Sequence, residues 1–329
     1  MPEPGYLKLA RSGELKERAA RLKERLRSCD ICPRNCHVDR ISDERGFCHS
    51  AFLPIVSSYC DHHGEEPALS GKRGSGTIFF GNCNLSCVYC QNHQISQDWK
   101  EQNKNEIAIL DLARDMIYLQ DRGCHNINFV SPSHFVPQVV LAVNEAVPMG
   151  LNIPLVYNSS GYDDFNTIKS LDGIIDIYLP DIRYSSDEAA LKYSGAKDYV
   201  VNSRNSIKEM YRQVGDLATD EDGIAVKGLI IRHLILPEGL AGTAESLEWL
   251  AKEVSPTVTL SLMAQYSPRF KAGQFREISR KITVREYEDA VAVVERLGFE
   301  NGWLQEMEAS DNYLPDFSAD DHPFESRTN

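Results

Sequence analysis

Short apolar runs alternate with longer amphipathic segments along most of this chain. Six runs rich in β-branched and aromatic residues predict buried strands, at 77–80, 126–130, 154–158, 174–179, 228–236 and 257–263. The segments between them have apolar residues at helical spacing and predict helices, at 107–120, 135–146, 165–170, 187–192, 205–214, 244–254 and 284–297. This alternation is typical of a parallel sheet whose strands are joined by helices. Because there are six units rather than eight, we expect an α/β fold, a partial (β/α)6 TIM-like barrel.

The two ends of the chain depart from this alternation. Residues 7–28 have apolar positions at helical spacing and predict one basic amphipathic helix on the surface. The aspartate-rich stretch from Ala309 onwards predicts a poorly ordered or loosely packed tail. We therefore expect three parts: an N-terminal helix with a cysteine-rich metal-binding segment at 1–70, the barrel at 71–306, and an acidic tail at 307–329.

Polar residues gather where the predicted strands end. In chain order, they are Ser131, Ser133 and His134, then Asn158 and Ser160, then Asp181 and Arg183, then Arg232 and His233, and finally Gln265. In barrels of this kind the chemistry lies at the carboxyl ends of the strands. Loops are polar in most proteins, however, so this pattern alone does not separate a site from ordinary solvent exposure.

Three cysteines follow the first predicted strand, with the spacing Cys83-x3-Cys87-x2-Cys90. Soft thiolate ligands suit iron–sulfur clusters, and three of them can hold three irons of a 4Fe–4S cubane. No fourth cysteine follows in the next turns, so one iron stays open to a small molecule. A partial zinc site is the alternative.

This spacing, with Tyr89 directly before the last cysteine, resembles the signature of radical S-adenosylmethionine (radical SAM) enzymes. The neighbouring strings 76–85 and 90–92 are similar to homologues of the pyruvate formate-lyase activating enzyme, in the group with an extra N-terminal cysteine segment. Further stretches with this similarity lie at 63–67, 157–162, 178–181 and 232–237. The resemblance covers roughly residues 29–306 and implies a barrel of the radical SAM type.

The resemblance implies that a 4Fe–4S cluster cleaves SAM reductively to a 5′-deoxyadenosyl radical, which takes a hydrogen atom from a glycine of a partner protein. It also implies an electron donor such as a flavodoxin or ferredoxin. Two alternatives remain open. One is radical modification of a peptide or small molecule, in a closed pocket lined by Arg183, His233 and Gln265. The other is an iron–sulfur electron-transfer protein without SAM chemistry, which requires a fourth protein ligand to the cluster.

The resemblance also suggests roles for single residues in binding SAM. Tyr89 and Asn92 are expected near the adenine, although core packing is the alternative for Tyr89. The run from Ser131 through Ser133 to His134 stands where related enzymes carry a Gly-Gly-Glu run that binds the methionyl amino group. Its hydroxyls and a neutral imidazole can accept hydrogen bonds from an ammonium group.

The later strand ends are expected to complete the site. Asn158 and Ser160 are expected at the ribose or the methionyl carboxylate, and Arg232 with His233 at SAM or the substrate. Asp181 and Arg183 stand where the family has Asp-x-Lys, so we expect Asp181 to bind a cation or orient the substrate. Arg183 is then expected to pair with a carboxylate. A structural salt bridge and a satisfied core histidine are the alternatives.

A second group of cysteines, Cys29, Cys32, Cys36 and Cys48, lies in the N-terminal segment. Four thiolates close a tetrahedral site, which suits structural zinc or an auxiliary iron–sulfur cluster. The turn residues Pro33 and Gly46 slightly favour a structural metal. Of the remaining cysteines, Cys60 is an extra ligand or a buried thiol, and Cys124 is expected to be structural.

Composition narrows the class of protein further. The 329 residues are 42% hydrophobic and 25% charged, which is typical of a soluble globular protein. The net charge of −13 disfavours nucleic acid or an anionic membrane as the main partner. The sequence has neither a signal-peptide core nor an apolar stretch of membrane-spanning length. We therefore expect a cytoplasmic protein, in which clustered cysteines bind metal rather than form disulfides.

Overall fold

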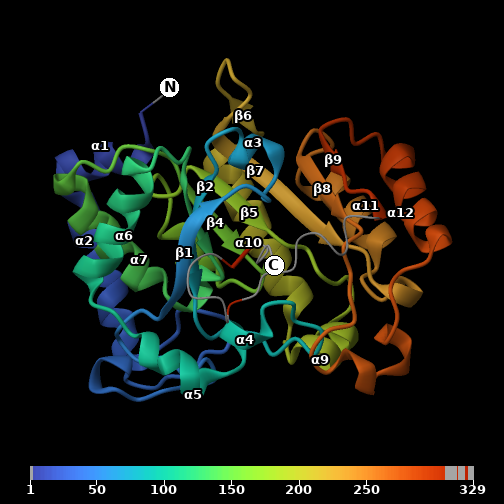
Figure 1. Ribbon diagram of the computed structural model, residues 1–329, viewed down its shortest axis with the longest axis horizontal. Coiled ribbons are helices and arrows are strands. Elements are labelled where there is room, and N and C mark those ends of the chain that lie inside the picture. Colours follow the sequence, from blue (N-terminus) through green and yellow to red (C-terminus); the bar gives the residue numbers. More distant parts are fainter. Residues whose placement is uncertain (1–2, 308–316, 318–322, 325–329) are drawn as a thin grey trace, which may run out of the picture.

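The computed structural model describes residues 3–307, 317, 323 and 324. Its centre is a curved sheet with the strand order β1-β2-β3-β4-β5-β7-β8-β9, and β6 pairs with β7 beside this path (Figure 1). The strands are β1 (Val56–His62), β2 (Ser75–Phe80), β3 (Ile127–Val130), β4 (Leu155–Ser159), β5 (Ile177–Pro180), β6 (Ala218–Thr219), β7 (Ala225–Leu234), β8 (Thr259–Met263) and β9 (Gly302–Leu304). From β2 to β9 all pairings along the path are parallel, whereas β1 is antiparallel to β2.

The six predicted strands correspond to β2, β3, β4, β5, β7 and β8, so the α/β prediction is confirmed. Among the described residues no pairing joins β1 to β9, which lie at the two ends of the path. The sheet therefore remains an open, partial barrel. Sequence patterns missed β1, β6 and β9, of which β6 and β9 are two and three residues long.

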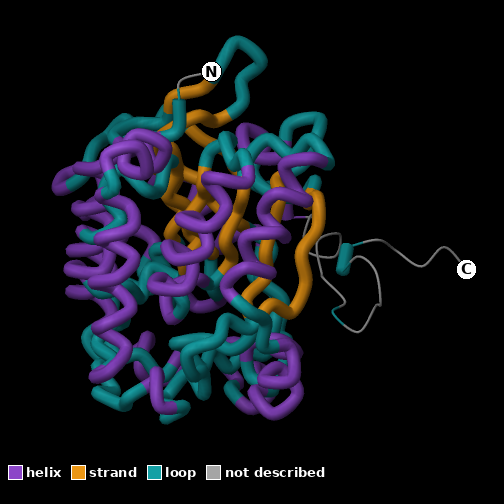
Figure 2. The backbone as a smooth tube through the Cα atoms, turned by 90° about the vertical axis from the view of Figure 1, so that its left-hand side faces the viewer, coloured by secondary structure: helices purple, strands orange, loops and turns teal. Residues whose placement is uncertain are grey.

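Helices cover the outer face of the strands (Figure 2). The α-helices of the described residues are α1 (Gly5–Ser12), α2 (Glu14–Glu24), α3 (Pro67–Ser70), α4 (His93–Ser96), α5 (Trp99–Gln102), α6 (Ile109–Asp121), α7 (Val136–Ala146), α8 (Phe165–Lys169), α9 (Asp187–Ser194), α10 (Tyr199–Val214), α11 (Thr243–Glu253) and α12 (Val284–Leu297). One large apolar core lies between this layer and the sheet. In the described part of the chain, no helix has the length and apolar character needed to cross a membrane.

The single helix predicted at 7–28 is wrong in one respect, because it is broken at Gly13. That glycine has φ +81°, a left-handed conformation that glycine adopts with little strain, and it separates α1 from α2. The first piece, α1, closes the amino ends of the strands. The Tyr6 hydroxyl donates to the carbonyl of Ile153 at 2.9 Å, and the Gly5 amide donates to Asp176 at 3.0 Å.

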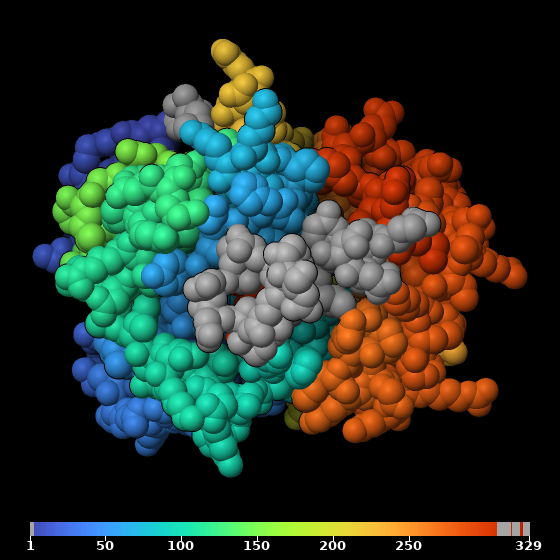
Figure 3. Space-filling model, in the orientation of Figure 1, coloured from blue at the N-terminus to red at the C-terminus, as the bar shows by residue number. Residues whose placement is uncertain are grey.

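The carboxyl ends of the strands meet at the opposite edge. An isolated parallel bridge pairs Asp181, just after β5, with Arg232 in β7, which places these two strand ends side by side. At the amino-terminal edge, the hairpin of β6 and β7 projects beyond the rest of the surface, as the yellow segment of the space-filling view shows (Figure 3). The predicted tail at 307–329 lies almost entirely outside the described residues.

Candidate active site at the carboxyl ends of the strands

The three cysteines that follow β2 surround one cavity. Cys83, Cys87 and Cys90 line a space of about 80 Å³. Ser131, Ser160 and Arg183 reach the same cavity from the ends of β3, β4 and β5. The topology thus brings the predicted cysteine loop and three of the predicted strand-end residues together. Among the described residues, no group of three Cys, His, Asp or Glu side chains is placed to hold a single metal ion.

Hydrogen bonds hold this cysteine loop in shape. Asn82 adopts φ +63° and donates through Nδ2 to the hydroxyl of Ser50 at 3.2 Å, which reverses the chain just after β2. The sulfurs of Cys83, Cys87 and Cys90 lie near the amide of Leu85 at 3.4 Å, the hydroxyl of Ser194 at 3.0 Å and the hydroxyl of Ser96 at 3.2 Å, respectively. Donors around sulfur ligands tune an iron–sulfur cluster.

Burial makes the thiols of Cys83 and Cys90 poor thiolates without a cation. Desolvation is the main cause that raises the pKa of Cys83 to about 12 and that of Cys90 to about 11, and the neighbouring Cys87 adds to both shifts. A bound metal centre supplies the positive charge that stabilises the thiolate form.

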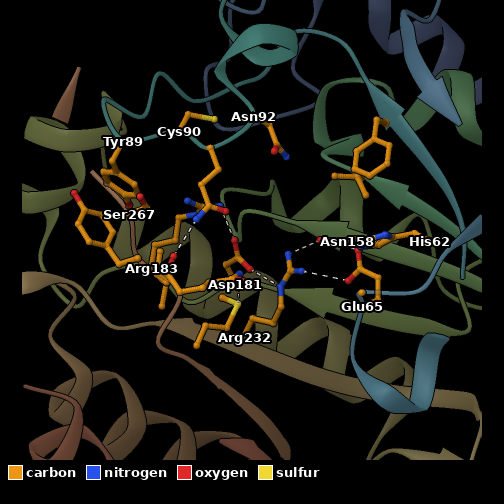
Figure 4. Close-up of a pocket in the computed structure, with 18 of the residues that line it drawn as sticks. His62, Glu65, Tyr89, Cys90, Asn92, Asn158, Asp181, Arg183, Arg232 and Ser267 are labelled. Atoms are coloured by element: carbon orange, nitrogen blue, oxygen red, sulfur yellow. Dashed lines mark hydrogen bonds and ion pairs between the residues drawn. The ribbon is translucent and has the colours of Figure 1, made fainter. Parts of the chain in front are cut away.

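A second space of about 200 Å³ adjoins the cysteine cavity and is the pocket drawn in Figure 4. Cys90, Asn92, Val130 and Arg183 line both spaces, so they form one continuous site. The side wall of this pocket includes Tyr89, whose hydroxyl lies 2.5 Å from that of Tyr184.

A chain of ion pairs crosses the floor of the pocket, with the side chains turned toward one another (Figure 4). Asp181 accepts from Arg183 Nη2 at 2.5 Å and from Arg232 Nε at 2.8 Å. Arg232 also donates to Asn158 at 2.5 Å and lies 3.6 Å from a carboxylate oxygen of Glu65. These groups are largely buried, and each charge has an opposite partner. Such a network fixes the side chains that face the pocket.

Sequence reasoning missed the acidic pair Glu65 and Glu66, which lies between β1 and α3. Glu65 lines the pocket, and Glu66 is 8% exposed. Desolvation is the main cause that raises the pKa of both carboxyls, to about 7 for Glu66, while Arg232 opposes the shift. Two successive acidic residues in the string 63–67 were the available signal. Nothing in their local pattern placed them opposite Arg232.

Three predicted site residues lie outside both the pocket and the cysteine cavity. His233 is fully buried on the other face of β7, where its ring nitrogens pair with the Ile182 carbonyl at 2.7 Å and the Thr243 hydroxyl at 2.9 Å. It is the satisfied core histidine, and burial lowers its pKa to about 4. The other two, Ser133 and His134, line neither the pocket nor the cysteine cavity.

Local hydrogen bonds explain where these two residues point. Ser133 bonds to the buried carboxylate of Asp163, which also accepts from Tyr157 and Ser159. The His134 ring lies 3.1 Å from the Gly81 carbonyl through Nε2. Only Ser131 of the predicted run reaches the cysteine cavity, because it takes a left-handed φ of +58° at the end of β3.

The N-terminal cysteines lie together as well. Cys29, Cys32, Cys36 and Cys48 line a small cavity of their own, with His134 on its wall. Gly46 is required there, because a Cβ atom at this position would lie 2.7 Å from the sulfur of Cys36. The other two cysteines, Cys60 in β1 and Cys124 before β3, are buried outside both cavities.

Two solved structures with a similar path of the backbone have low sequence identity to this protein. The hydrogenase maturase HydG has a TM-score of 0.43 and 13% identity, covering 68% of this chain and 49% of HydG, so this chain aligns with about half of that protein. Methylornithine synthase (PylB) has a TM-score of 0.41 and 12% identity, covering 73% of this chain and 77% of the synthase. At these TM-scores the likeness carries no inference about function.

No family model matches the chain. A search of curated proteins gives a relative from Methanocaldococcus jannaschii named Uncharacterized protein MJ0674, which is 31% identical over 284 residues. The alignment covers 83% of this chain and 76% of that protein. With this identity over most of both sequences, the chain belongs to the same protein family as MJ0674.

Proposed function

We propose that this chain is a radical SAM enzyme whose catalytic cluster is held by Cys83, Cys87 and Cys90. The observation that carries this proposal is the cavity around the three thiols. Among its described lining residues there is no further cysteine, histidine or carboxylate. The donor set therefore fits a 4Fe–4S cluster with one corner left for a small molecule. When bound, such a cluster supplies the electron that cleaves SAM into methionine and a 5′-deoxyadenosyl radical.

The residues of the chain bind and orient SAM in this proposal. Arg183 lies where the cysteine cavity meets the pocket, and its guanidinium suits the methionyl carboxylate because Asp181 already holds it in place. Asn158 and Arg232 offer further polar contacts from the neighbouring strands. Tyr89 and Asn92 form the wall on the nucleoside side. The buried surroundings exclude water from the reacting atoms.

For the substrate, we propose a glycine of a partner protein, as in the activating enzymes that the sequence resembles. The alternative is a peptide or small molecule. The charged pocket is the observation that favours this alternative, since it presents both carboxylates and guanidinium groups toward one space. Of the three residues expected for such a pocket, Arg183 and Gln265 line it and His233 does not.

The proposed chemistry is tested by anaerobic reconstitution with iron and sulfide, reduction with dithionite, and measurement of 5′-deoxyadenosine and methionine from SAM. We expect both products from the native protein and none from Cys87→Ala. Cys124→Ala, a buried cysteine outside both cavities, is the matched control and should retain cleavage. If Cys87→Ala cleaves SAM at the native rate, the assignment is wrong. If the reconstituted native protein holds a cluster but never cleaves SAM, the electron-transfer alternative replaces it.

The substrate class is tested by the origin of the abstracted hydrogen. An extract of the source cells grown in deuterated medium is separated by size, and each fraction is incubated with the enzyme and unlabelled SAM. Deuterium in 5′-deoxyadenosine from the protein fraction, with a glycyl radical signal in electron paramagnetic resonance, supports the activating enzyme. Deuterium from the small-molecule fraction alone supports the alternative.

A further inference from the structure

The N-terminal cysteines share one small cavity, which Cys29, Cys32, Cys36 and Cys48 line together. Among the described residues, however, no three Cys, His, Asp or Glu side chains are placed to hold a single metal ion. Structural zinc requires such a set, because its four ligands converge on one ion and hold thiolate sulfur at about 2.3 Å. The cysteines of a 4Fe–4S cluster bind separate irons, so they need not converge on one point. The placement of the four thiols therefore favours a cluster.

Two arginines give this cavity a positive wall. Arg40 is 1% exposed, and its guanidinium donates to the carbonyls of Ala51, at 2.8 Å and 3.1 Å, and His134, at 2.6 Å. Its Nη1 also lies 3.9 Å from the sulfur of Cys29. Within the described residues no carboxylate pairs with Arg40. A buried cation without an acidic partner is costly, so an anionic centre held by four thiolates stabilises it.

The second arginine, Arg34, lies between Cys32 and Cys36 in the sequence and also lines the cavity. It donates to the carbonyls of Asn84 at 2.8 Å and Gly195 at 2.6 Å, again without a carboxylate partner among the described residues.

One buried donor on this wall, Nη2 of Arg34, lacks a hydrogen-bond partner in the described structure. Unpaired buried polar groups are rare, and each calls for a partner. The sulfur atoms of an iron–sulfur cluster accept hydrogen bonds from the surrounding protein. The thiolate sulfurs of any four-cysteine metal centre also accept such hydrogen bonds. The unpaired donor therefore indicates an anionic, sulfur-rich occupant of the cavity.

We propose that Cys29, Cys32, Cys36 and Cys48 hold a second 4Fe–4S cluster, with Arg34 and Arg40 balancing its charge. This reverses the slight preference for a structural metal that the turn residues gave. The second cluster lies directly against the first cysteine loop, because Arg34 bonds to Asn84, the neighbour of Cys83. All four protein corners are occupied, so this cluster binds no SAM.

The experiment uses the full chain with the first site removed, as the triple variant Cys83→Ala, Cys87→Ala, Cys90→Ala. After anaerobic reconstitution with iron, sulfide and an equal amount of zinc, we expect about four irons and four sulfides per chain and a 4Fe–4S Mössbauer spectrum. Adding Cys36→Ala should remove this iron, whereas adding Cys124→Ala should not. One zinc without iron, or no metal at all, overturns the proposal.

This result is separable from the proposed function. A native chain that cleaves SAM yet holds iron only at the first site refutes the second cluster alone. A chain that holds the second cluster yet never cleaves SAM refutes the radical chemistry alone.

The charge-balancing role has its own readout, the midpoint potential of the second cluster in the triple variant. Removing a nearby cation disfavours the more negative, reduced form, so adding Arg40→Met should shift the potential to a more negative value. Arg40→Lys keeps the charge and should restore it. Arg45→Met is the control, because Arg45 pairs with Asp43 and Glu106 outside the cavity. An unchanged potential in Arg40→Met, with the cluster intact, contradicts the role of Arg40.

Discussion

Two carboxyl groups beside the pocket lie where burial disfavours their charged form. Glu66 is buried beside Glu65, and its Oε2 atom has no hydrogen-bond partner among the described residues. Glu66 is far from Arg232 in the sequence, so the sequence alone does not show how the two side chains lie in the folded chain. The ionisation of such a residue depends on its surroundings in the fold rather than on the motif in which it stands.

The ionisation of Glu66 should appear in the pH dependence of stability. Its pKa is about 7 in the folded chain against an ordinary value of 4.5. The folded state therefore binds this proton more tightly, so the contribution is complete below pH 4.5 and is lost as the pH rises through about 7. We expect Glu66→Gln to have a flatter profile of unfolding free energy between pH 4.5 and 7.5 in urea titrations. Parallel profiles for the two proteins would contradict this account.

At the scale of the element, β7 separates pocket from core within two successive residues. Side chains along a strand point alternately to its two faces. Arg232 therefore reaches the pocket while His233 packs beneath the sheet. Sequence alone could not show which of these two residues points into the site, since both are polar and either could have been buried with hydrogen-bond partners.

This alternation predicts opposite outcomes for neighbouring substitutions. Arg232→Met removes the cation that faces Asp181 and Glu65, so we expect a strong loss of SAM cleavage with a folded protein. His233→Asn loses a core contact, so we expect a lower melting temperature but near-native SAM cleavage by the folded fraction well below that temperature. The two measurements are 5′-deoxyadenosine formation and thermal unfolding followed by circular dichroism. Equal loss of cleavage in both variants would place His233 back among the site residues.

The elements that carry periodic apolar patterns were predictable, and those that depend on tertiary contacts were not. All six predicted strands gave a clear signal because they consist mostly of apolar residues and are largely buried on both faces. The short β9 has no such run. Only glycine fits at its first residue, because a Cβ atom at Gly302 would collide with the carbonyl oxygen of Leu260 in the neighbouring strand. The sequence shows a glycine at position 13, but not that the helix breaks there. The left-handed φ of Gly13 depends on how α1 packs at the amino ends of the strands.

For the site, the cysteines and the strand-end polar groups could be predicted, since motif spacing and topology place them. The positions that the Ser133 and His134 side chains take in the fold could not be predicted. They depend on Asp163 and Gly81, partners 30 and 53 positions away in the sequence.

At the scale of the whole molecule, the two ends of the barrel have different tasks. The carboxyl ends of the strands carry the pocket, while α1 closes the amino ends through Tyr6 and Gly5. Residues at the amino end of such a barrel contribute to stability rather than chemistry.

A substitution at the closed end tests this division. Tyr6 is fully buried, so Tyr6→Phe leaves the carbonyl of Ile153 without its donor and should cost about 1 kcal/mol of unfolding free energy. SAM cleavage should stay at the native level. The control is Tyr118→Phe, since Tyr118 is 49% exposed. A large loss of cleavage in Tyr6→Phe, at full occupancy of the folded state, would show that the closed end also shapes the pocket.

The contact between Arg34 and the peptide carbonyl of Asn84 has a consequence for the life of the protein in air. The same guanidinium lines the N-terminal cysteine cavity, so one side chain joins the two cysteine loops. A movement of either loop is therefore transmitted to the other, and air oxidation of thiols in one loop should also change the reactivity of thiols in the other.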